Sequence, residues 1–174
     1  MLATFLVEYP WLTPAVLAVF IVASPILTRW LRPRRGLTLG LFLASTVVVL
    51  ALVLVPTGRD LTAGCLVEWS IPYPKAVEPF ANVALFVPPV FLGALLLGRP
   101  LLAAACGVAA SALIELTQAL LPALGRSCST GDWLANSIGA LIGAAIALLG
   151  IRLHARRRTY VIRPMETTRE PPHN

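Results

Sequence analysis

The chain has 174 residues, of which 57% are hydrophobic and 13% charged, and its mean hydropathy is +0.81. A soluble domain normally carries about 25% charged residues, so this composition excludes an ordinary soluble protein. The net charge of +6 does not indicate a nucleic-acid partner, because the basic residues gather between apolar runs and do not alternate with aromatic residues on a polar face.

Five apolar runs predict an all-α fold, namely a polytopic transmembrane helical bundle with about five membrane-spanning helices. The runs lie near Trp11 to Leu31, Leu37 to Val55, Asn82 to Leu97, Leu101 to Leu121, and Trp133 to Leu149. Four of them reach roughly 25–32 Å as helices, which is enough for the hydrocarbon core of a bilayer. The third is shorter and contains Pro88-Pro89, so we expect its helix to be kinked or partly unwound there.

The basic residues predict how the bundle is oriented. Three of them lie in the loops after the second and fourth runs, namely Arg59, Lys75 and Arg126. The other eleven lie on the opposite side and are Arg29, Arg32, Arg34, Arg35, Arg99, Arg152, Arg156, Arg157, Arg158, Arg163 and Arg169. This positive-inside bias predicts an N-terminus outside and a C-terminus in the cytoplasm. We therefore expect a short extracytoplasmic N-terminus (1–10), a transmembrane domain (11–155) and a basic, disordered cytoplasmic tail (156–174).

The three cysteines fall in different settings. Cys65 and Cys128 lie in the two outer loops, whereas Cys106 lies inside the fourth run, where we expect it to be buried. Two cysteines on an oxidising side can pair, and the alternative is two free thiols. We expect a disulfide that ties the long outer loop over the last two helices.

Polar residues interrupt the ends of the fourth and fifth runs. Glu115 and Gln118 are three apart, and Asp132 and Asn136 are four apart, so each pair shares one helical face. A carboxylate in an apolar run costs several kcal/mol unless it is neutralised or paired, and a spanning helix does not require one. Arg126, in the short loop between the runs, is the expected counter-ion for Glu115 or Asp132.

Small residues continue these faces into the membrane. Gly107 and Ser111 precede Glu115, while Gly139 and Gly143 continue the polar face of the fifth run. Small residues let helix backbones approach closely, so we expect two antiparallel helices that converge on an outward-facing polar pocket. The expected pocket residues are Asn82, Glu115, Gln118, Arg126, Asp132 and Asn136.

A purely structural interpretation of these residues stays open. A Glu-Arg pair with Asn and Gln can simply hold two helices together. Asp132 can serve only to cap the N-terminus of the fifth helix, and Asn82 can do the same for the third. Hard oxygen ligands from these residues are weak support for Mg²⁺ or Ca²⁺, and we predict neither a metal site nor a cofactor.

The polar motifs resemble those of the VanZ-like membrane protein family. The residues that carry the resemblance are Asn82, Leu85, Phe86 and Pro88, then Glu115 and Gln118, then Arg126, Asp132, Asn136 and Gly139. The match covers a core of about residues 82–150, and it departs from the family at Pro89-Val90, where an apolar residue and Gly are usual. The resemblance implies a multi-pass protein of the cell envelope whose namesake is associated with teicoplanin (glycopeptide) resistance.

Three classes of function follow, and we rank binding first. The chain would then sit in the cell membrane among its lipids and recognise a lipid-linked cell-wall precursor, a glycopeptide or another headgroup-bearing molecule. An enzyme with Glu115 as general acid or base ranks second, because both histidines lie on the cytoplasmic side. A transporter ranks third, since the inner halves of the last two runs are apolar. The oligomeric state stays open.

Overall fold

The fold is a bundle of long helices. The computed structural model describes residues 8–57, 64–69, 72–73 and 76–162, with side chains up to Ala155. The helices are α2 (Leu12–Leu31), α3 (Arg35–Leu54), α4 (Val77–Leu97), α5 (Pro100–Leu120) and α6 (Thr130–Ile162). Within the described residues, these five helices are long and apolar enough to cross a membrane. The predicted all-α, five-span bundle is confirmed.

Two helices differ from their expected extent. α4 begins at Val77, so Asn82 lies inside it and does not cap it, and the helix runs unbroken through Pro88 and Pro89. The expected unwinding is absent there. Each proline lacks an N–H donor and strains a helix, and the close packing of the α4 backbone on α6 at Val83 and Val87 holds α4 helical. α6 continues past Ala155 to Ile162, into the segment expected to be a tail. Residues 1–7 and 163–174 lie outside the described part.

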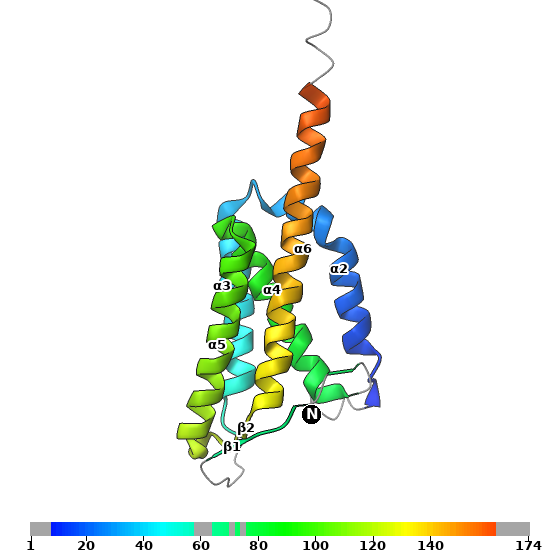
Figure 1. Ribbon diagram of the computed structural model, residues 1–174. Helices are drawn as coiled ribbons and strands as arrows, with labels where there is room; N and C mark the ends of the chain where they lie inside the picture. The colour runs from blue at the N-terminus through cyan, green and yellow to red at the C-terminus, as the bar shows by residue number, and fades with distance from the viewer. Residues whose placement is uncertain (1–7, 58–63, 70–71, 74–75, 163–174) are drawn as a thin grey trace, which may run out of the picture.

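α6 is the centre of the bundle (Figure 1). α4 makes its most extensive contacts with α6, and α5 and α2 also pack on α6. α3 packs mainly on α4, and among its residues only Thr38 and Val49 are buried. The α2–α3 and α4–α5 turns lie at one end of the bundle (Figure 1). We call the opposite end, which holds the segment 64–69 and the start of α6, the strap end. At the α4–α5 turn, Gly98 has φ +64° and Pro100 opens α5.

Glycines bring α4 against α6. A Cβ at Gly139 would collide with the carbonyl oxygen of Val83, and a Cβ at Gly143 would lie 2.6 Å from that of Val87. The two glycines of the small-residue face of α6 therefore pack on α4, while Ala140 of the same face lies against Gly107 of α5, as expected. A small-residue face permits close approach without specifying the partner helix.

Gly107 on α5 performs a similar role. A Cβ at Gly107 would lie 2.7 Å from Cγ2 of Val90 on α4 and 3.0 Å from Cβ of Ala140 on α6. The absence of a side chain at Gly107 leaves room for Val90 at this contact. Gly107 thus packs against both α4 and α6.

A short parallel strand pair crosses the strap end. β1 (Cys65–Leu66) pairs with β2 (Cys128–Ser129), with Cys65 opposite Cys128. The two cysteines form a disulfide with a Cα–Cα distance of 4.5 Å, so the predicted bond is confirmed. Cys106 is a free, exposed cysteine, and our expectation that it is buried was wrong. Other helices cover only the face of α5 that carries Gly107 and Ser111, and Cys106 lies outside that face.

The orientation of the termini remains a prediction. In a Cys106→Ala background, a cysteine introduced at Ser127 should react with a membrane-impermeant thiol reagent on intact cells, and a cysteine at Arg32 should react only after lysis. The measurement is labelling before and after permeabilisation. Labelling at Arg32 on intact cells would reverse the predicted topology.

Candidate functional site

The register of α5 against α6 places their polar residues at matching levels. Gly107 lies against Ala140. In two antiparallel helices, a residue four positions later in one helix lies at the level of a residue four positions earlier in the other. Ser111 therefore lies at the level of Asn136, and Glu115 at the level of Asp132. This places Glu115 and Asp132 together at the strap end, as the sequence predicts.

Glu115 is bonded to the strand that opens α6. Its side chain is 7% exposed, and its Oε2 accepts the backbone N–H of Ser129 at 2.9 Å. Asp132 acts on Glu115 electrostatically. Within the described part of the chain, the hydrogen-bond donor to the Glu115 carboxylate is a neutral backbone N–H.

Ser129 and Glu68 join the site, although the sequence analysis missed both. The hydroxyl of Ser129 donates to Oε1 of Glu68 at 3.0 Å and accepts the N–H groups of Gly131 at 3.0 Å and Asp132 at 3.4 Å. Ser129 thus caps α6, and Asp132 occupies its first turn. The signal was present, because Ser129 and Asp132 have the spacing of a capping box with an acidic third residue.

The loop that carries Glu68 is fixed to the start of α6. The N–H of Glu68 donates to Oγ1 of Thr130 at 2.8 Å, and the same hydroxyl donates to the carbonyl of Glu68 at 2.7 Å. Trp69 packs edge-on against Trp133 with ring centroids 6.4 Å apart. These contacts, together with the disulfide, hold the Glu68 carboxylate over the end of α6.

Asp132 is bonded to α4. Nδ2 of Asn82 donates to Oδ1 of Asp132 at 2.7 Å, which is the role of Asn82 in place of helix capping. Glu78 and Glu68 lie close enough to act on Asp132 electrostatically. We refer to Glu68, Glu78, Glu115 and Asp132 as the carboxylate cluster.

Arg126 does not neutralise this cluster. In the described part of the chain no ion pair joins it to Glu115 or Asp132, and its Nε donates to the carbonyl of Val55 at 3.4 Å. Gln118 also turns to α3, where its Nε2 donates to the carbonyl of Val53 at 2.9 Å. Gln118 and Arg126 thus bond to the end of α3 and not to the other predicted pocket residues. Both bind backbone carbonyls that α3 leaves open at its C-terminal end.

Two buried polar atoms lie below the cluster without a hydrogen-bond partner among the described residues. They are Oδ1 of Asn136, whose side chain is 3% exposed, and Oγ of Ser111, which is fully buried. Buried polar atoms are nearly always bonded in folded proteins. Asn136 and Ser111 therefore add unused hydrogen-bonding capacity between α5 and α6, one turn below Glu115.

The site is rich in carboxylates, with Glu68, Glu78 and Glu115 all acting on or lying beside Asp132. Its carboxylates accept hydrogen bonds from neutral groups, and no group of three Asp, Glu, His or Cys side chains in the described residues has the geometry to hold a metal ion. The complementary ligand group is a cation or a strong hydrogen-bond donor.

Comparison with known proteins identifies the family. The model of the VanZ/LLP1 family matches residues 15–151. The chain belongs to the VanZ/LLP1 family. The match extends from α2 into α6, well beyond the core of about residues 82–150 expected from the motifs. No curated protein and no solved structure matches the chain significantly.

The three VanZ-like motifs meet at the strap end. The first supplies Asn82, which bonds Asp132 of the third, and the second supplies Glu115, which bonds Ser129 within the third. Gly139 of the third motif lies against the α4 backbone at Val83, next to Asn82 in the chain. In this VanZ/LLP1 protein the motifs thus join α4, α5 and α6 into one unit.

Proposed function

We propose that this VanZ/LLP1 protein is a binding protein of the cell envelope. In the cell membrane, with the strap end outside, the carboxylate cluster receives a protonated amine or similar donor on a lipid-linked cell-wall precursor, a glycopeptide or another headgroup-bearing molecule. The observation that supports this proposal is the bonding of Glu115 and Asp132 to neutral donors.

The energetics of burial favour a ligand over a helix lock. A buried carboxylate that accepts only neutral hydrogen bonds keeps much of its desolvation cost. A protein that merely joined two helices gains nothing from such a residue, since Gln accepts the same N–H without charge. A cationic ligand offsets the cost when it binds.

Binding also fits the site better than catalysis does. A general acid or base must contact the reacting atoms of its substrate, whereas a buried carboxylate such as Glu115 attracts a nearby cation through its charge without direct contact. The more exposed members of the cluster, Glu68 and Glu78, are available to contact a headgroup. Because the resemblance includes a teicoplanin-resistance protein, we take teicoplanin as the first probe.

Replacing Glu115 with Gln tests the proposal. Gln keeps the shape and the acceptor for Ser129 N–H but removes the charge, so the protein should fold normally and bind teicoplanin about tenfold more weakly or worse. The measurement is teicoplanin affinity of the protein in nanodiscs, together with teicoplanin susceptibility of a host that expresses each variant.

Glu8→Gln is the matched control, because Glu8 is an exposed carboxylate that precedes α2, and it should behave as the unaltered protein. A folded Glu115→Gln variant with unchanged affinity and unchanged protection of the host would contradict the proposal. Failure of the unaltered protein to bind teicoplanin would remove glycopeptides from its ligands.

A further inference from the structure

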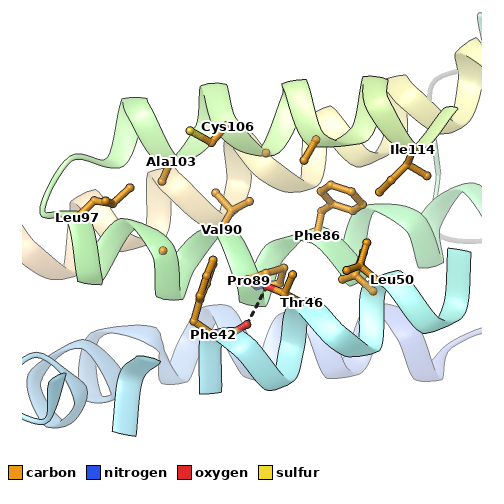
Figure 2. Close-up of a pocket in the computed structure, with 14 residues that line it drawn as sticks. Phe42, Thr46, Leu50, Phe86, Pro89, Val90, Leu97, Ala103, Cys106 and Ile114 are labelled. Carbon is orange, nitrogen blue, oxygen red and sulfur yellow. Dashed lines mark hydrogen bonds between the residues drawn. The ribbon is translucent and has the colours of Figure 1, made fainter. Parts of the chain in front are cut away.

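A second feature, separate from the carboxylate cluster, is an apolar groove of about 230 Å³ between α3, α4 and α5. Figure 2 shows its walls, which include Phe42 from α3, Phe86 and Val90 from α4, and Ile114 from α5. Thr46 carries the hydroxyl in the wall, and this hydroxyl donates to the carbonyl of Phe42 at 2.8 Å. The groove therefore offers dispersion contacts and no unused hydroxyl.

The groove lies along the bundle at membrane depth and opens to its side. From Ala103 to Ile114 its α5 wall rises about 16 Å, roughly half of the hydrocarbon core. Four of its lining residues are exposed, namely Leu50, Leu97, Cys106 and Ala110. Since all three walls are membrane-spanning helices, the medium at this opening is hydrocarbon.

The guanidinium of Arg126 lies at the strap end of the helices that line the groove. Gln118, one turn beyond Ile114, is bonded to Val53 of α3, and Arg126 is bonded to Val55, which caps α3. Arg126 is half-buried, and among the described residues its guanidinium bonds through Nε alone, which leaves the two terminal nitrogens as donors. The guanidinium thus has donors to offer where α3 and α5 leave the membrane.

We propose that the groove binds a hydrocarbon chain of a membrane phospholipid and that Arg126 binds the phosphate of the same lipid. A guanidinium matches the planar, two-point hydrogen bonding of phosphate oxygens, and an apolar groove that faces hydrocarbon excludes water. One amphipathic molecule satisfies both features, with its chain between α3 and α5 and its phosphate at the strap end.

This lipid site shares no residue with the carboxylate cluster. Glu115 contacts β2, whereas Arg126 and the groove contact α3. A test of the lipid site therefore does not depend on whether the carboxylate cluster binds a headgroup.

Two pairs of matched variants test the site. Ala110 lines the groove and Ala109 is exposed on the same helix outside the lining, so Ala110→Trp should fill the groove and Ala109→Trp should not. Arg126→Gln removes the phosphate partner, and Arg99→Gln removes an exposed arginine at the opposite end of the bundle.

The measurement is native mass spectrometry of the full chain in detergent with dioleoyl-phosphatidylglycerol added. Retention of this lipid should fall about tenfold in Ala110→Trp and in Arg126→Gln, and it should stay unchanged in both controls. Dioleoylglycerol, which lacks the phosphate, should bind the unaltered protein as weakly as the phospholipid binds Arg126→Gln.

Thermal unfolding of each variant checks that the fold persists, and Arg126→Gln leaves the helix packing untouched. Equal lipid retention in Arg126→Gln and Arg99→Gln would overturn the proposal. So would a lipid-free dimer that forms in the unaltered protein and is lost in Ala110→Trp, because a second copy would then cover the groove.

Discussion

Replacing Gly139 with alanine should destabilise the bundle by about 3 kcal/mol or more, which is the upper part of the range for overpacked sites. The added Cβ would meet the carbonyl oxygen of Val83 and approach Cβ of Phe86 at 3.1 Å. Backbone cannot rotate out of the way as a side chain can, so α4 must move off α6 and lose contacts along their whole interface. The measurement is the thermal or denaturant midpoint in detergent micelles.

Gly40→Ala is the control for this substitution. Gly40 lies on α3 with nothing within 4 Å of the position of its Cβ, and alanine is the better helix former. The midpoint of Gly40→Ala should therefore be equal or slightly higher. If Gly139→Ala unfolds at the same midpoint as Gly40→Ala, α4 and α6 are not in backbone contact at this position.

Removing the disulfide should have the second large effect. The bond joins residues 63 apart, and closing a loop of that length lowers the entropy of the unfolded chain by an amount worth about 4 kcal/mol. Cys65→Ala with Cys128→Ala should lower the unfolding midpoint accordingly. It should also release the loop that carries Glu68 and so weaken any ligand binding at the carboxylate cluster.

The chain contains its own control for cysteine replacement. Cys106→Ala removes a free, exposed thiol and should leave the midpoint unchanged. If the double variant unfolds at the same midpoint as Cys106→Ala, the hydrogen bonds of Glu68 to Ser129 and Thr130 hold the strap end without the disulfide.

The sequence predicted the helices well because the hydrocarbon core sets their length and composition. The start of α4 was missed, since Val77–Ala81 includes Glu78 and Pro79 and breaks the apolar run. Both residues are in fact favourable in the first turn of a helix, and α4 begins there. Cys106 was misplaced because an apolar run does not show which face of its helix meets lipid.

The candidate site was predicted in part. Spacing within a helix fixed the faces of Glu115 and of Asp132, and these two residues do lie together. The position of Arg126 depends on the path of the loop after α5, which charge alone does not determine. Arg126 therefore lies over α3, where the carbonyl of Val55 accepts its Nε–H, and the expected ion pair does not form.

The disulfide also has a consequence for biosynthesis. Cys65 precedes α4 and Cys128 follows α5, so two membrane crossings separate the cysteines and both reach the same side whichever way the chain is inserted. The thiols cannot meet until the α4–α5 hairpin has entered the bilayer completely. The oxidised chain is thus a marker of an inserted α4–α5 hairpin, and a pulse-chase experiment that separates oxidised from reduced protein reports when the hairpin is in place.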